Sequence, residues 1–349
     1  MNAMLASWRE VATHLALILA TGAVSLVSTA LVAVLVGSRF SFWLDKTSML
    51  LAFALGHILL WAVLWDGATV ITSKLLPGRR GLWRRMGFFS LGPWPLLLMA
   101  PAVYFVVQTA NITLISLTLL DSVTAWRDSF FWALEGGLFS WVTRHAVLVL
   151  AWETLYHSAW TIELGAVFLL FVVGRKPRLL TSFFVSFILI FYLGRLIGLV
   201  TPVMGPAFYQ PELFDYLDGS PSGLAMEYIA RLIAMDPADV TLNAALLGGV
   251  SAMPSLHIAM VGLTAYWLGV GNRKTMFFTV PWVLTVWAST VMLGWHYALD
   301  GAGGLFLAAG AIAMTSWMVR RWLAAALRLK PPQSVADTTF EMPRSSVNG

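Results

Sequence analysis

Long apolar runs separated by short polar loops extend through most of the chain. Runs of about twenty residues, the length that crosses the hydrocarbon core of a bilayer, fall near residues 11–37, 48–73, 87–109, 155–173, 179–201, 254–271, 276–294 and 298–319. The pattern predicts an all-α fold, a polytopic membrane helical bundle with about eight transmembrane helices.

Residues 111–154 interrupt this pattern. The stretch 112–120 is apolar but too short to cross a membrane, and residues 130–141 are rich in Trp and Phe with Glu135 as their single charge. This composition is typical of a helix in the membrane–water interface, and a merely structural aromatic belt is the alternative. We therefore expect N-terminal transmembrane helices over 1–110, an external interfacial segment over 111–154, a transmembrane core with the candidate chemistry over 155–325 and a disordered cytoplasmic tail over 326–349.

Composition narrows the class of protein. The chain is 59% hydrophobic and 11% charged, and it has no cysteine, which excludes disulfides, thiolate catalysis and cysteine metal sites. The six histidines form no HExxH or comparable ligand cluster, so neither a metal site nor a cofactor is expected. The net charge of +5 does not indicate nucleic acid, because most Lys and Arg fall in short loops between apolar runs.

The distribution of charge predicts the orientation in the membrane. Most of the basic residues lie on one side of the eight-span arrangement, which places that side and both termini in the cytoplasm. Residues 203–253 carry six Asp or Glu against Arg231 alone, which suits an external segment. The starts of the runs 254–271 and 298–319 then lie at the external face, and the composition fits a bacterial inner membrane. The sequence does not indicate an oligomeric state.

Two histidines stand at these external ends. Ser255 is a helix-start residue, so we expect His257 in the first turn of a helix, where free N–H groups and the helix dipole favour an anion. His296 and Asp300 are four residues apart, which places them on one face of a helix. A carboxylate beside one ring nitrogen fixes the tautomer and leaves the other nitrogen free to attack or to accept a proton. One His–Asp pair and one separate His are the equipment for two-step transfer through a covalent intermediate.

Pro-Ser-Leu-His at 254–257 and His-x-x-x-Asp at 296–300 resemble the PSxH and HxxxD elements of the type-2 phosphatidic acid phosphatase superfamily of membrane phosphoesterases and phosphotransferases. The resemblance covers roughly residues 155–320 and implies a six-helix catalytic core. It implies that His296 is the nucleophile that forms a phosphohistidine and that Asp300 orients it. It also implies that His257 protonates the leaving oxygen and that Ser255 helps to hold the phosphoryl group.

The chain departs from the common superfamily pattern at the phosphate-binding cations. Thr290 stands six residues before His296, where SRxxxxxHxxxD has arginine, and the KxxxxxxRP element is absent. The upstream segment from Arg195 to Tyr209 contains Thr-Pro…Gly-Pro…Tyr and looks more like the inositol phosphorylceramide synthase branch, whose members transfer a phospho-headgroup between lipids. Arg195, Gly205 and Tyr209 are therefore candidate substrate-binding residues.

Several other polar residues are candidates whose roles the sequence leaves open. Four external residues could supply the missing positive charge: Arg127, Arg144, His145 and His157. Glu163 lies inside the expected span 155–173 and needs a partner there, which the sequence does not identify.

Three functions remain open from the sequence. The first is a lipid phosphotransferase that moves a phosphoryl or phospho-headgroup from a membrane lipid donor to an alcohol acceptor at the external face. The second is a lipid phosphate or polyprenyl diphosphate phosphatase, in which water is the acceptor. The third is a non-catalytic lipid-binding or transport protein. The expected partners are the phospholipid bilayer, the lipid donor and the alcohol acceptor.

Overall fold

The described part of the chain consists of helices and loops, with no strand. The computed structural model describes residues 2–42, 99–123, 126–167, 176–241 and 251–328, with 67–68, 70–72, 74–75, 171 and 244–245. Its α-helices are α1 (Asn2–Leu35), α4 (Met99–Val123), α5 (Asp128–Arg144), α6 (Val149–Val167), α7 (Pro177–Val200), α8 (Pro206–Tyr209), α9 (Pro221–Ile233), α11 (Leu256–Gly271), α12 (Met276–Met292) and α13 (Ala298–Arg328). Short 3-10 turns cover Pro211–Leu213, Asp215–Leu217 and Arg273–Thr275.

Hydropathy identifies the helices that cross the membrane. Four helical stretches in the described residues are long and apolar enough: Glu10–Leu35, Pro177–Val200, Arg273–Met292 and Ala298–Ala325. Tyr104–Leu120 and Leu256–Gly271 are shorter apolar helices. The prediction of an all-α membrane bundle is confirmed, and the protein is an integral membrane protein. Most of the expected span 48–73, the first part of 87–109 and the tail from residue 329 lie outside the described residues.

Helix α4 joins two stretches that the sequence pattern separates. The end of the expected span 87–109 and the apolar stretch 112–120 form one helix, so the expected boundary near residue 110 falls inside it. The polar residues at this point are buried and have partners. Gln108 Nε2 donates to Thr29 Oγ1 of α1 at 2.7 Å. Asn111 accepts the N–H of Ser41 at 2.9 Å and donates to its carbonyl at 2.8 Å. The polar residues near position 110 therefore serve helix packing and do not mark a loop.

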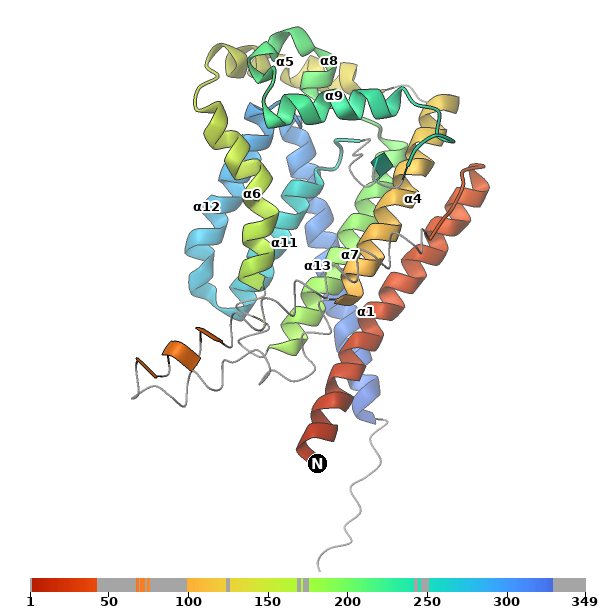
Figure 1. Cartoon of the computed structure of the whole chain (residues 1–349), viewed down its shortest axis with the longest axis vertical. Helices are drawn as coiled ribbons and strands as arrows, with labels where there is room; N and C mark the ends of the chain where they lie inside the picture. The colour runs from red at the N-terminus through yellow and green to blue at the C-terminus, as the bar shows by residue number, and fades with distance from the viewer. Residues whose placement is uncertain are drawn as a thin grey trace, which may run out of the picture.

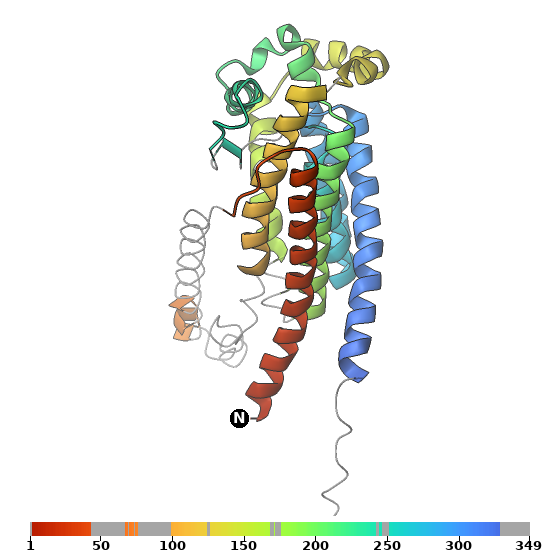
Figure 2. The same ribbon diagram turned by 90° about the vertical axis from the view of Figure 1, so that its right-hand side faces the viewer.

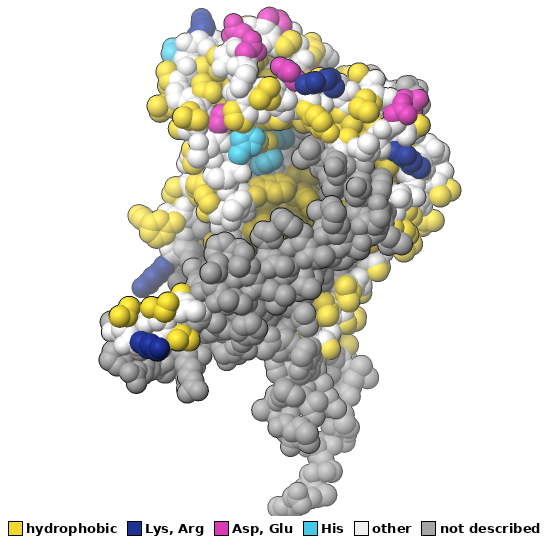
Figure 3. Space-filling view, viewed as in Figure 1, with side chains coloured by type: hydrophobic (Ala, Val, Ile, Leu, Met, Phe, Trp, Pro, Cys, Tyr) yellow, Lys and Arg dark blue, Asp and Glu magenta, His cyan; other side chains and the backbone are white. Residues whose placement is uncertain are grey.

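The helices form an upright bundle with a layer across one end. In Figure 1, α1, α4, α6, α7, α11, α12 and α13 run side by side, while α5, α8 and α9 lie across the upper end. The N-terminus and the end of α13 lie at the lower end (Figures 1 and 2). Acidic side chains gather at the upper end in Figure 3. The sequence-predicted external segment 203–253 thus supplies much of the upper layer.

Helix α7 lies inside the bundle, packed against α1, α4, α11 and α13. Hydroxyl groups add hydrogen bonds to this apolar core. Ser186 Oγ of α7 donates to Thr315 Oγ1 of α13 at 2.8 Å and accepts the indole N–H of Trp267 of α11 at 3.2 Å. At the lower end, Lys176 Nζ donates to the Gly271 carbonyl at 2.8 Å, where a cation suits the C-terminus of α11.

Glu163 has partners on two neighbouring helices. Its carboxylate, on α6, accepts the hydroxyl of Thr264 of α11 and the indole N–H of Trp282 of α12, both at 3.2 Å. Glu163 is buried, so these bonds replace the water that the carboxylate loses. They link α6, α11 and α12 and supply the partners that the sequence does not identify.

Helix α5 has two distinct faces. Asp128, Phe131, Phe139 and Val142 are buried against the protein. Phe130, Leu134 and Trp141, in contrast, are 60%, 59% and 53% exposed. In Figure 2, α5 projects beyond the side of the bundle at its upper end. The interfacial position expected for this segment remains a prediction that its exposed apolar face favours.

We predict that Glu163→Ala destabilises the protein by about 1–3 kcal/mol, because two buried donors lose their acceptor. Glu163→Gln keeps one acceptor oxygen for Trp282 and is expected to have a much smaller effect. Thermal unfolding in detergent measures both, with Glu227→Ala on the exposed face of α9 as the control. Equal shifts for the alanine and glutamine variants would contradict this role.

Candidate active site

The starts of α11 and α13 are in direct backbone contact. The N–H of Ser255, the residue before α11, donates to the carbonyl of Asp300 in the first turn of α13 at 2.9 Å. Gly304 makes this approach possible, because a Cβ there would lie 2.4 Å from the Ser255 carbonyl oxygen. The contact places the Pro-Ser-Leu-His and His-x-x-x-Asp elements together at the upper end of the bundle.

His257 lies in the first turn of α11, as the sequence predicts. Ser255 is the N-cap, and its hydroxyl accepts the N–H of Ile258 at 3.4 Å. The ring of Tyr156, from α6, stacks on His257 with centroids 4.2 Å apart, and its hydroxyl shares a 3.3 Å hydrogen bond with His257 Nδ1. The ring of Trp160, one turn further along α6, has its centroid 5.1 Å from that of His257. These aromatic residues fix the imidazole and leave Nε2 for chemistry.

His296 lies in the loop just before α13 and is 8% exposed. Its Nδ1 is 3.6 Å from Oδ2 of the fully buried Asp300. This is slightly longer than a hydrogen bond, and the same carboxylate oxygen accepts the N–H of Tyr297 at 2.8 Å. The expected pair is therefore present, at the loose distance common in active sites without substrate. His296 itself lies two residues before α13 and not on the helix, where the spacing predicts it. The pair leaves Nε2 of His296 for attack.

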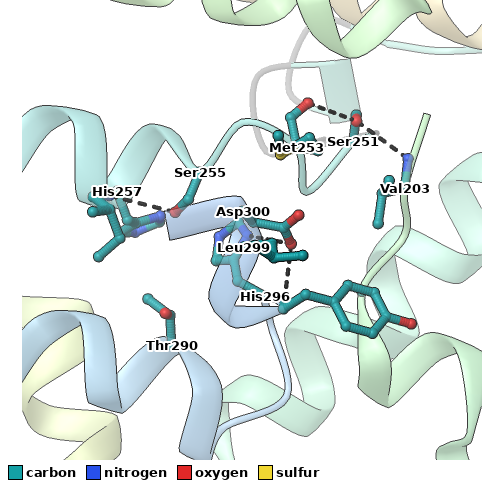
Figure 4. Close-up of polar contacts among 12 residues, drawn as sticks. Val203, Ser251, Met253, Ser255, His257, Thr290, His296, Leu299 and Asp300 are labelled. Atoms are coloured by element: carbon teal, nitrogen blue, oxygen red, sulfur yellow. Dashed lines mark hydrogen bonds and ion pairs between the residues drawn. The ribbon is translucent and has the colours of Figure 1, made fainter. Parts of the chain in front are cut away.

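The two histidines face each other across a short gap. Their ring centroids are 6.3 Å apart, with the rings inclined at 58°. Figure 4 shows His257 and Ser255 at the start of α11, with His296 and Asp300 at the start of α13. In Figure 3, histidine side chains lie at the upper edge of a hollow, below α9 and above hydrophobic side chains.

Gly205 supports the loop that carries His296. It has φ +113° and ψ 159°, and a Cβ there would lie 2.5 Å from the Trp295 carbonyl oxygen. The next segment is bound to the same loop, because the N–H of Ala207 donates to the Gly294 carbonyl at 3.0 Å. Gly205, a candidate substrate-binding residue in the sequence, therefore contacts the backbone directly before His296.

Arg195, Tyr209 and Thr290 make other contacts. Arg195 donates to Thr113 of α4 at 3.4 Å, and the ring of Tyr209 lies 5.9 Å from that of Trp132 of α5. The hydroxyl of Thr290, which stands where the superfamily pattern has arginine, donates to the Trp287 carbonyl at 2.8 Å. The backbone carbonyl of Thr290 accepts the N–H of His296 at 3.3 Å. Thr290 thus supports the loop through its backbone.

Of the four external cation candidates, His157 has the contacts nearest to the site. Its Nε2 lies 3.1 Å from the buried carboxylate of Glu153 and 3.4 Å from the hydroxyl of Ser222. That hydroxyl also accepts the indole N–H of Trp295, the residue before His296, at 3.0 Å. Arg144 and His145 instead bond to carbonyls of α5 itself. Within the described ranges no group of three potential metal ligands occurs.

Sequence reasoning missed Tyr156, Trp160 and Glu153 as neighbours of the site. Their only sequence signal is spacing, because Glu153, Tyr156 and Trp160 follow one another at three and four residues along α6. That spacing places them on one face without showing which helix the face contacts. The fold supplies that information.

The family comparison agrees with this geometry. A family model described as the PAP2 superfamily matches residues 122–314, more than half of the chain. The match contains both histidines, Asp300 and the whole of α5. No curated protein and no solved structure matches the chain.

We predict that Gly205→Ala lowers activity severely and destabilises the fold by about 1–3 kcal/mol, since this backbone conformation is essentially restricted to glycine. Its Cβ would also collide with the Trp295 carbonyl. Gly219→Ala is the matched control, because Gly219 has φ +72° but no atom within 4 Å of the added Cβ. Turnover and thermal unfolding measure both variants. Similar activity in the two would show that the contact with Trp295 is unimportant.

Proposed function

Since the chain belongs to the PAP2 superfamily of membrane phosphatases and phosphotransferases, we propose that it is a lipid phosphotransferase that uses His296 as nucleophile. The observation that carries this proposal is the 6.3 Å separation of the His257 and His296 rings. Reacting atoms meet at about 3–3.5 Å, so both rings can contact one phosphoryl group placed between them. The donor is a membrane lipid and the acceptor is an alcohol.

In the first step Nε2 of His296 attacks the phosphorus of the donor. The P–N bond forms and the bond to the leaving oxygen breaks, while protonated His257 gives its proton to that oxygen. Asp300, beside Nδ1, keeps the attacking nitrogen unprotonated and stabilises the positive charge that develops on the ring. The product is a phosphohistidine.

In the second step His257, now neutral, takes the proton of the acceptor hydroxyl. The acceptor oxygen attacks phosphorus, the P–N bond breaks and His296 is restored. The N-terminus of α11, capped by Ser255, lies beside this reaction and favours the negative charge on the phosphoryl oxygens. Ser255 thus acts mainly by holding the first turn of α11 in place.

The charge of the site supports a phosphodiester donor and hence transfer of a phospho-headgroup. Thr290 stands where the superfamily pattern has arginine, and its hydroxyl is bonded to the Trp287 carbonyl. Asp300 adds a negative charge close to the reacting group. A phosphomonoester carries up to two negative charges and a phosphodiester only one, so the diester is repelled less. This favours transferase over phosphatase activity and agrees with the resemblance to the inositol phosphorylceramide synthase branch.

The proposal includes the external face of the membrane as the place of reaction. Both histidines lie at the end of the bundle opposite to Lys176, Arg273 and Lys274. By the positive-inside rule those basic residues are cytoplasmic. The exposed apolar face of α5 would then lie in the outer leaflet, beside the route by which a lipid enters the site.

We predict that purified protein converts phosphorus-labelled phosphatidylinositol and a ceramide acceptor into a new labelled phospholipid. His296→Ala is expected to abolish this product, because the nucleophile is lost. His145→Ala is the matched histidine control and is expected to leave the rate unchanged, since His145 packs on Trp141 of its own helix. Thin-layer chromatography of labelled lipids gives the readout. Release of labelled inositol phosphate without a new lipid would show that water is the acceptor and that the protein is a hydrolase instead.

We predict that His257→Ala lowers turnover of natural donors by about 10²–10⁴-fold, the usual contribution of a general acid–base group. With a nitrophenyl phosphodiester the leaving group needs no protonation, so the first step proceeds and the second stalls. If this diester is labelled at phosphorus, the variant should therefore accumulate protein-bound label. That label should be stable to base and labile to acid, as expected for a phosphohistidine. Absence of this label in His257→Ala, with normal folding, would argue against the covalent intermediate.

A further inference from the structure

Helix α5 carries two carboxylates on its inward face, and the proposed chemistry uses neither. Asp128 and Glu135 are seven residues apart, which is about two helical turns, so both lie on the same side of the helix. Between them the ring of the buried Phe131 lies 5.3 Å from that of Tyr297. The inward face of α5 therefore covers the residues that lead from His296 into α13.

Glu135 binds the first turn of α13. Its Oε2 accepts the N–H of Ala298 at 2.6 Å, and its Oε1 accepts the N–H of Leu299 at 2.8 Å. These N–H groups have no acceptor within their own helix, and the helix dipole favours a negative charge there. The preceding N–H, of Tyr297, is bound by Asp300. The three N–H groups that directly follow His296 are thus all held by carboxylates.

Asp128 binds the segment that supports His296 from the other side. Its two carboxylate oxygens accept the N–H groups of Met204 and Gly205, each at 2.9 Å. The Tyr297 hydroxyl donates to one of the same oxygens at 3.4 Å. Because Gly205 packs on the Trp295 carbonyl, Asp128 restrains the backbone just before His296. The two carboxylates hold the segments on both sides of this residue.

No hydrogen bond holds Nδ1 of the His296 ring in the described structure, so the ring has little direct support on that side. This nitrogen is buried, and Asp300 lies 3.6 Å away. The direction of the ring therefore depends on the backbone of the loop. That backbone is held by Thr290, by Asp300 and by the two carboxylates of α5.

We propose that Asp128 and Glu135 are positioning residues that fix His296 in the direction of attack by binding the backbone on both sides of it. This inference rests on the proposed role of His296 as nucleophile.

The cost of placing these carboxylates also indicates a function beyond stability. Burial raises the pKa of both the Asp128 and the Glu135 carboxyl, and the backbone N–H groups only partly offset this. The charge of Asp300 raises both pKa values further. A helix end can be capped by an uncharged Ser or Thr. Two partly desolvated carboxylates bind the backbone around one loop, and precise placement of that loop explains them better than stability alone.

Glu135→Gln tests the proposal, because glutamine keeps the size but has one acceptor oxygen for two N–H groups. We expect kcat to fall about 10- to 100-fold, the loss typical of a small misplacement of a reacting group. The KM for the lipid donor should change less than about threefold, since Glu135 does not contact the substrate. Hydrogen exchange followed by mass spectrometry should show faster exchange in the peptide that contains Ala298 and Leu299. Exchange in α7 should stay as in the unmodified protein.

Asp128→Asn is the second variant and should lower kcat in the same way, with faster exchange at Met204 and Gly205. Glu227→Gln, on the exposed face of α9, is the matched carboxylate control and should change neither readout. Unchanged exchange at Ala298 and Leu299 in Glu135→Gln would overturn the proposal. Faster exchange with an unchanged kcat would also overturn it. The exchange measurement needs no substrate, so it gives an answer even if the enzyme has another donor or no transferase activity.

Discussion

The arrangement of the site depends on one backbone contact, between Ser255 before α11 and Asp300 in α13. The two histidine elements are about forty residues apart and belong to different helices, yet this contact leaves their rings 6.3 Å apart. It requires the absence of a side chain at Gly304, because a Cβ there would overlap the Ser255 carbonyl. Close helix approach through small residues is a common solution in membrane proteins, where apolar packing and not exclusion of water drives association.

The transmembrane helices and the surface layer make different contributions to this site. The bundle brings His257 and His296 together through the starts of α11 and α13. The surface layer holds the segments around the loop before α13. Carboxylates of α5 accept the N–H groups of Met204 and Ala298, and the N–H of Ala207 in α8 donates to the Gly294 carbonyl. The family match includes α5 as well as the histidine-bearing helices, so both parts lie within the matched region. The bundle helices therefore carry the two histidines, and the surface layer holds the backbone around His296.

The sequence alone predicts the parts of this protein that depend on local pattern. Hydropathy predicts the membrane helices, and the sequence around Ser255 predicts that His257 starts a helix. The spacing of His296 and Asp300 predicts a pair on one helix face, whereas the pair forms between the loop before α13 and the first turn of that helix. The sequence cannot predict which helices contact each other. The contact of Tyr156 with His257 and the partners of Glu163 are therefore known only from the structure. The boundary expected near residue 110 falls inside α4, where buried polar residues interrupt the hydropathy pattern without ending the helix.

The Glu163 contacts also bear on the order in which the protein is assembled. An ionisable side chain in an apolar environment is costly unless it has a partner. Its partners, Thr264 and Trp282, lie on α11 and α12, which leave the ribosome about a hundred residues after α6. The partners of the Glu163 carboxylate are therefore present only once α11 and α12 have been synthesised. Since α6 also carries Tyr156, the same contacts join the helix whose tyrosine stacks on His257 to the helix that carries His257.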